Sequence, residues 1–152
     1  MPPPLTGRCL CGAVRYQVND EPLVVYACHC TDCQKRSGSA FGLSMWVRRD
    51  AIEVIGGEAA LHASRHSDGS PRVGRVCAQC GTRLWSEPGK HPGLAVMRPG
   101  TLDDTSSLQP AAHLWTRSAQ PWVVFPAGAV RFDTQPEDFG QLIALGRNRA
   151  GA

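Results

Sequence analysis

Three thiols fall within six residues in the segment 28–33, which reads Cys-His-Cys-Thr-Asp-Cys. Core packing does not explain this density, because a free cysteine in a core behaves as a small, isolated apolar side chain. A short loop can direct three sulfurs at one point, where a soft divalent metal such as zinc would bind. Three protein ligands leave a fourth position open on zinc, so Cys28, Cys30 and Cys33 are predicted to form a catalytic zinc site.

Two other cysteine pairs carry a feature that this triad lacks, because each ends in Cys-Gly, at residues 11–12 and 80–81. In a metal knuckle the backbone turns tightly so that N–H groups point at the sulfurs, and glycine takes the positive φ that this turn needs. The two pairs therefore predict a second, closed zinc site of four thiolates that joins distant parts of the chain. Its predicted ligands are Cys9, Cys11, Cys77 and Cys80.

Other uses of the seven cysteines stay open at this point. A Cys-x-x-Cys pair can be a redox dithiol, but residues 77–80 lack the βαβ context of that motif. An odd number of cysteines argues against a pure disulfide framework. Iron–sulfur ligation also suits thiolates. The strongest rival is a single metal site accompanied by three thiols that bind nothing.

Length and composition place the chain among ordinary globular proteins. Its 152 residues fit one domain, with 42% apolar and 19% charged residues. A net charge of +3 without a block of like charges gives no indication of a specific nucleic-acid surface. The N-terminus has no signal-peptide pattern, and no stretch approaches the length of a membrane span. We therefore expect a cytoplasmic protein with reduced thiols; composition does not fix its oligomeric state.

A short helix is predicted directly after the second cysteine of the triad. Thr31 and Gln34 form a capping box, so the helix should begin at Thr31 and end near Ser37, with Gly38 as its C′ residue. Cys33 then lies in the first turn, where unpaired backbone N–H groups favour a thiolate. Lys35 and Arg36 add positive charge that could attract the carboxylates of a substrate.

The remaining chain predicts an all-β domain of short strands separated by glycine and proline. Residues 1–8 are expected to be a loose lead-in, and the core to cover about residues 7–125. Residues 136–145 predict a C-terminal helix that ends at Gly146. It would lie within a surface appendage of residues 126–152. The predicted strands cover residues 13–18, 23–27, 41–47, 52–55, 59–64, 72–76, 84–85, 94–97, 113–116 and 122–125.

Two histidines are further candidates. His29 lies inside the triad and could ligate the metal or carry protons. In extended backbone, however, its side chain points away from the neighbouring sulfurs, so we expect it to act from behind the ligands. His113 and Trp115 alternate on one predicted strand, and an aromatic core is the default interpretation for both.

The pattern as a whole resembles the glutathione-dependent formaldehyde-activating enzyme family, which also includes centromere protein V. The resemblance runs in order from about Gly7 to Phe125. Its motifs are Gly-Arg-Cys-Leu-Cys-Gly at residues 7–12, Cys-His-Cys-Thr-Asp-Cys at 28–33, Ser-Gly-Ser-Ala-Phe at 37–41, Cys-Ala-Gln-Cys-Gly at 77–81, Gly-Thr-Leu-Asp-Asp at 100–104, His-Leu-Trp at 113–115 and Pro-Trp at 121–122.

The resemblance implies a mainly β fold, the β-tent, built from short antiparallel strands around two zinc ions per chain. It implies a structural zinc on the four-cysteine set and a catalytic zinc on Cys28, Cys30 and Cys33. The implied activity is that of a carbon–sulfur lyase that joins glutathione to formaldehyde as S-hydroxymethylglutathione, or cleaves such an adduct. The alternative is a noncatalytic, zinc-stabilised binding module like centromere protein V.

Overall fold

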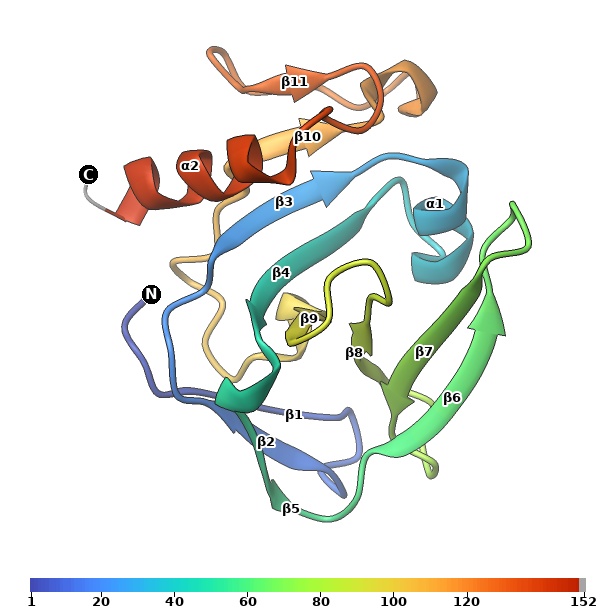
Figure 1. Ribbon diagram of the computed structural model, residues 1–152, viewed down its shortest axis with the longest axis vertical. Helices are drawn as coiled ribbons and strands as arrows, with labels where there is room; N and C mark the ends of the chain where they lie inside the picture. The colour runs from blue at the N-terminus through green and yellow to red at the C-terminus, as the bar shows by residue number, and fades with distance from the viewer. Residues whose placement is uncertain (151–152) are drawn as a thin grey trace. The chain divides into compact units, whose positions relative to one another are not determined.

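The computed structural model describes residues 1–150, and the side chains of residues 1–147. The chain is mainly β, as the sequence predicts (Figure 1). It forms two compact units. The first unit contains Met1–Pro22 and Met45–Leu108; the second contains Leu23–Ser44 and the chain from Gln109 onward. No helix among the described residues has the length and apolar character to cross a membrane.

A three-stranded antiparallel sheet opens the first unit, with the order β1 (Leu5–Arg8), β2 (Arg15–Val18) and β5 (Ile52–Gly56). Tyr16 and Val18 alternate with more exposed residues on β2, so one face of the strand is fully buried. Gly7 on β1 leaves room for the ring of Tyr16, because a Cβ at Gly7 would overlap that ring.

The other strands that have residues in this unit form a larger antiparallel arrangement, and β4 enters the unit at Met45. Its order is β4 (Gly42–Arg48), β9 (Leu94–Met97), β8 (Arg83–Glu87), β7 (Pro71–Val76) and β6 (Ala60–Arg65). The 3₁₀ turns η1 (Arg49–Ala51) and η2 (Pro99–Thr101) follow β4 and β9. Met45 lies opposite Met97, which in turn lies opposite Trp85, so large buried side chains meet across three strands.

Three strands of the second unit pair in parallel. β3 (Val24–Cys28) and β11 (Arg131–Phe132) flank β10 (Ala112–Leu114). Every residue of β3 is buried, which is typical of a strand covered on both faces. Helix α1 (Thr31–Ser37) follows β3, and the turn η3 (Thr116–Ser118) follows β10. Helix α2 (Phe139–Ala150) packs along β3 (Figure 1), and its Leu142 is fully buried.

Several sequence predictions differ from the structure. Residues 1–8 contain β1, and β11 was not predicted. The predicted strand 122–125 is wrong, since these residues form a turn and irregular chain that exposes Trp122 and Val124. The parallel pairs depart from the antiparallel pairing we expected. Residues 131–132 and Leu142 are packed within the second unit, so the described part of 126–152 is not a surface appendage; residues 151 and 152 lie outside the described residues.

Candidate metal centres

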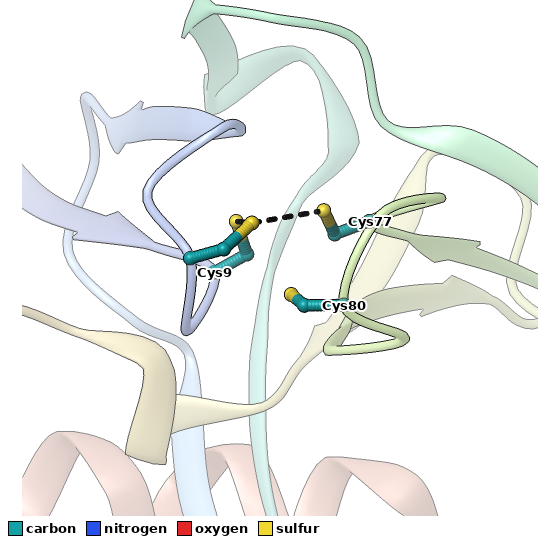
Figure 2. Close-up of side chains that lie close together, drawn as sticks. Cys9, Cys77 and Cys80 are labelled. Carbon is teal, nitrogen blue, oxygen red and sulfur yellow. Dashed lines mark hydrogen bonds between the residues drawn. The ribbon is translucent and has the colours of Figure 1, made fainter.

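Four thiols in the first unit meet in what we call the four-thiol cluster: Cys9, Cys11, Cys77 and Cys80. Their sulfurs all lie within 4.8 Å of one another. The Sγ atom of Cys11 is 3.5 Å from that of Cys9 and 3.7 Å from that of Cys77. Figure 2 shows Cys9 on one loop facing Cys77 and Cys80 on another. The cluster therefore brings together the two pairs that the sequence predicts to share a metal ion.

Glycines build the two loops of this cluster in the same way. Gly12 has a φ of +78° and Gly81 a φ of +72°. The N–H of Gly12 donates to the carbonyl of Cys9 at 3.0 Å, and the N–H of Gly81 to the carbonyl of Cys77 at 2.9 Å. The turn at residues 9–12 then directs the N–H of Val14 at the Cys9 sulfur, 3.2 Å away. This is the knuckle geometry that the Cys-Gly pairs predict.

Thr82 contacts both loops of this cluster, a role that the cysteine spacing does not predict. Its hydroxyl accepts a hydrogen bond from the N–H of Leu10 at 3.1 Å and lies 3.1 Å from the Cys80 sulfur. The hydroxyl thus joins the two loops directly. Hydrogen bonds from the Thr82 hydroxyl and, next, from the backbone N–H of Cys11 lower the pKa of Cys80 to about 5. Its place immediately after the knuckle glycine is the signal that could have identified it.

The second unit contains the three-thiol cluster, formed by Cys28, Cys30 and Cys33 with all sulfurs within 4.8 Å of one another. Cys28 ends β3, and the N–H of His29 extends the pairing with β10 by donating to the carbonyl of Leu114 at 2.9 Å. Among residues 1–147, no histidine or carboxylate joins these three thiols as a further metal ligand. Both clusters offer donor sets that suit a soft divalent metal ion.

Cys30 belongs to the three-thiol cluster and is also the N-cap of α1. The helix begins at Thr31 and ends at Ser37 as predicted, but its N-cap is Cys30 rather than Thr31. The Sγ atom of Cys30 accepts from the N–H of Cys33 at 3.3 Å. Gly38 closes the helix with a φ of +63°, and its N–H donates to the carbonyl of Gln34. The expected capping box is therefore replaced by a cap in which a sulfur of the three-thiol cluster satisfies a helix N–H.

Cys28 and Cys30 differ in their tendency to ionise. Hydrogen bonds from the thiols of Cys28 and, next, Cys33 lower the pKa of Cys30 to about 2. The same contacts, with Cys30 first and Cys33 second, raise the pKa of Cys28 far above its usual value, and burial raises it further. Negative charge therefore collects on Cys30, at the helix N-terminus, where backbone N–H groups favour an anion. Metal ligands of this type bind as thiolates.

His29 lies in a buried aromatic environment. Its Nε2 is 3.1 Å from Nδ1 of His113, and its ring centre is 5.1 Å from that of Phe41 and 5.3 Å from that of Phe125. Its Nδ1 is buried and has no hydrogen-bond partner among the described residues. Burial and, next, the neighbouring charge of His113 lower the pKa of His29. The structure places His113 in an aromatic cluster with His29 and Phe125, as predicted. Trp115, for which the same aromatic core is expected, is only partly buried and stacks with Arg117.

Trp115 is held in an uncommon conformation where the chain leaves β10. Its φ of 58° and ψ of 40° place it in the left-handed region, which costs a non-glycine residue about 1–3 kcal/mol. Its backbone N–H donates to the carbonyl of Thr134 at 3.2 Å, and its indole N–H to Gln135 at 3.4 Å. The guanidinium of Arg117 stacks 5.1 Å from the indole centre. These contacts fix the turn that leads to Ser118.

Comparison with known proteins identifies the family. The family model for glutathione-dependent formaldehyde-activating enzymes matches residues 4–118, a range that contains all seven cysteines. The chain belongs to this family. A Halomonas elongata protein that carries the family's name provisionally is 28% identical over 124 residues, covering 78% of this chain and 79% of that protein. A Penicillium rubens protein named in the same way is 34% identical over 88 residues, covering 56% of this chain and 45% of that protein.

A solved structure has a similar fold. A Rhodobacter sphaeroides protein superposes on this chain with a TM-score of 0.53 at 19% sequence identity. The match covers 84% of this chain and 99% of the Rhodobacter protein. At this identity the likeness concerns the fold alone.

Proposed function

We propose that the chain is a zinc-dependent carbon–sulfur lyase that forms or cleaves the adduct of a thiol with an aldehyde. Glutathione and formaldehyde, which the family's name identifies, are the proposed substrates. In this proposal one zinc ion binds at each cluster. The four-thiol cluster has a structural role, and Cys28, Cys30 and Cys33 hold the catalytic ion.

The difference in ligand number between the clusters carries the proposal. Four cysteines form a complete tetrahedral set for zinc, typical of structural sites. The three-thiol cluster supplies one ligand fewer, and no histidine or carboxylate of the described residues joins it. A catalytic zinc keeps such a position for water or substrate. When bound, the ion would favour the thiolate form of a substrate sulfur placed there.

Residues of the second unit would prepare this site. The lowered pKa of Cys30 favours the thiolate, the form in which cysteine binds a metal ion. His29, which burial keeps neutral, would support the ligand loop through His113 rather than bind the metal itself. Lys35 and Arg36 occupy the last turn of α1, where a positive charge also complements the helix dipole. Attraction of glutathione carboxylates would be a second role for them.

The proposed reaction balances without an oxidant or a reductant. In the direction of synthesis, the substrate sulfur forms a bond to the aldehyde carbon, and the carbonyl π pair moves onto oxygen. The oxygen then receives the proton that the thiol gave up. Cleavage reverses each step: the hydroxyl loses its proton, the carbonyl reforms, and the carbon–sulfur bond breaks with its electron pair on sulfur.

Exchange spectroscopy by NMR tests this function. Zinc-loaded protein is mixed with glutathione and ¹³C-formaldehyde, and the exchange rate between free and adduct carbon is compared with buffer. We expect the protein to accelerate exchange, and Cys30→Ser to return the rate to that of buffer. If the wild-type chain binds two zinc ions yet leaves the exchange rate unchanged, the lyase proposal fails and a noncatalytic binding module becomes the better description.

A further inference from the structure

We propose that Gln34 is a positioning residue of the three-thiol cluster. Its side-chain amide would hold the peptide group between His29 and Cys30 in the orientation that lets the sulfurs converge on a metal ion. This inference rests on the proposed function only in taking the three-thiol cluster as a metal site. It concerns binding of the ion, so it is tested without turnover.

Gln34 contacts two consecutive carbonyls of the ligand loop. Its Nε2 donates to the carbonyl of His29 at 2.8 Å, and its backbone N–H donates to the carbonyl of Cys30 at 3.0 Å. The second bond is part of the helix, whereas the first reaches back beyond it. Together they fix the peptide planes on both sides of the Cys30 Cα, and with them the direction of the Cys30 side chain.

The same amide connects the ligand loop to the segment that follows β10. Nε2 of Gln34 also donates to the carbonyl of Ser118 at 2.8 Å, and Oε1 accepts from Nε2 of Gln120 at 3.2 Å. The indole N–H of Trp122 donates to Oε1 of Gln120 at 2.8 Å, which fixes how the Gln120 amide is turned. Three of the four hydrogen-bonding positions of the Gln34 amide are therefore used.

These partners require a neutral donor at position 34. Both carbonyls can only accept, so the nitrogen of the amide must face them, and Gln120 presents its NH₂ group to the remaining oxygen. A glutamate has the same shape and could still accept from Gln120. It would, however, place a negatively charged oxygen against the carbonyls of His29 and Ser118. Hydrogen-bonded partners that orient metal ligands typically contribute about 10–100-fold in metal affinity.

Zinc competition with a chromogenic chelator, together with native mass spectrometry for stoichiometry, tests the inference on the full chain. We expect wild-type protein to hold two zinc ions. In Gln34→Glu the four-thiol cluster should keep its zinc, while the affinity of the three-thiol cluster falls about 10–100-fold. Gln34→Met removes the donors without adding charge, so it should also weaken only the three-thiol site. Gln109→Glu, at an exposed position of the same unit, adds the same charge and should change neither affinity.

Cobalt substitution gives a readout that a loss of stability would not imitate. Cobalt bound by thiolates has intense charge-transfer absorption, and the band from the three-thiol cluster should change in Gln34→Glu and Gln34→Met while circular dichroism stays that of a folded chain. Wild-type-like affinity and spectrum in either folded variant overturn the inference and leave the proposed function intact. If the wild-type chain binds only one zinc ion, the metal site fails, and both proposals fall with it.

Discussion

A single glycine after the second cysteine of each pair shapes the two loops of the four-thiol cluster. Gly12 and Gly81 adopt positive φ, and nothing lies within 4 Å of where their Cβ atoms would be. Space is therefore not what requires glycine there; the backbone conformation is. The three-thiol cluster has no such residue, because its sulfurs are placed by the end of β3 and the first turn of α1.

Gly81→Ala is expected to destabilise the protein by backbone strain alone. A left-handed conformation costs an alanine roughly 1–2 kcal/mol, so the free energy of unfolding should fall by about that amount. The affinity of the four-thiol cluster for zinc should fall with it. Urea unfolding at fixed free zinc measures the first effect, and chelator competition the second.

Gly100→Ala is the matched control for this strain. Position 100 is equally free of neighbours within 4 Å but has no positive φ, so alanine should be tolerated there. Equal losses in Gly81→Ala and Gly100→Ala would show that the positive φ of Gly81 is unimportant.

The partition of the thiols could be predicted from sequence because Cys-Gly encodes a local conformation. The N-cap of α1 could not. A capping box at residues 31–34 is a regular pattern, yet Cys30 takes the cap, since its sulfur already points at the N–H of Cys33. The amide of Gln34, freed from capping, reaches His29 and Ser118 instead. The contact with Ser118 spans 84 residues, and a contact between such distant residues produces no periodic pattern in the sequence.

At the scale of elements, Gly146 explains how α2 lies against β3. The sequence predicts that Gly146 ends the helix, but α2 continues through it to Ala150. A Cβ at this position would overlap the carbonyl oxygen of Leu23 and lie 3.0 Å from the Cα of Val24. The glycine therefore allows close packing of the helix on the strand. From sequence alone, such a glycine cannot be distinguished from one that ends a helix.

Gly146→Ala should destabilise the protein, although alanine is normally better than glycine in a helix by about 1 kcal/mol. The clash is with backbone, which cannot move aside cheaply, so the thermal midpoint should fall. Gly140→Ala in the same helix is the control. There the nearest atoms belong to the flexible side chain of Asp138, and we expect an unchanged or raised midpoint. A raised midpoint in Gly146→Ala would contradict close packing at this residue.

Glu87 joins three elements of the first unit, and its protonation should matter in acid. One carboxylate oxygen accepts from Arg49 of η1 at 3.0 Å, from Arg75 of β7 at 3.3 Å and from the Trp85 indole at 3.4 Å. Burial alone would raise the pKa of Glu87, but the hydrogen bonds from Arg49 and Trp85 and the charge of Arg75 hold it below its usual 4.5. Its stabilising effect is therefore present above pH 4.5 and is lost as pH falls through the lowered pKa.

Glu87→Gln should lower the free energy of unfolding at pH 7, because it removes the negative charge that Arg49 and Arg75 contact. The loss should be only roughly 1 kcal/mol, since solvent screens the charge of a partly exposed group. The difference from wild type should shrink as pH falls below 4.5. Denaturant unfolding across pH 3–7 measures this difference in the free energy of unfolding. Any loss of zinc in acid affects both proteins and therefore cancels in the difference. Glu58→Gln, at an exposed residue, should match wild type throughout. A constant difference between Glu87→Gln and wild type at every pH would refute the linkage.

For the molecule as a whole, the sequence predicts the mainly β class and most strands, because alternation of side chains is local. Pairing is not local. β3 and β10 are far apart in sequence yet pair in parallel, with Leu114 opposite Cys28. The strand predicted at 122–125 fails because Trp122 and Val124 are held in a loop, where Trp122 bonds to Gln120. Segments whose placement depends on distant partners are the ones that sequence patterns miss.

The two clusters connect the chain over different ranges. The four-thiol cluster joins Cys11 to Cys77, 66 residues apart, whereas the three-thiol cluster lies within the segment 28–33. Structural zinc contributes on the order of 10 kcal/mol in small zinc-binding peptides, against a net stability of roughly 5–15 kcal/mol for a typical domain. Loss of a metal ion from each cluster should therefore have very different consequences.

Cys11→Ser should lose the zinc that joins residues 9–11 to 77–80 and yield unfolded or aggregated protein. Cys30→Ser should stay folded and soluble with one zinc ion but lose exchange activity, because its cluster closes no long loop. Zinc analysis, circular dichroism and thermal melting on both variants separate these outcomes. If Cys30→Ser unfolds as completely as Cys11→Ser, the three-thiol cluster is structural and the lyase proposal loses its main support. If Cys11→Ser remains folded and fully active, the assignment of roles to the two clusters is wrong.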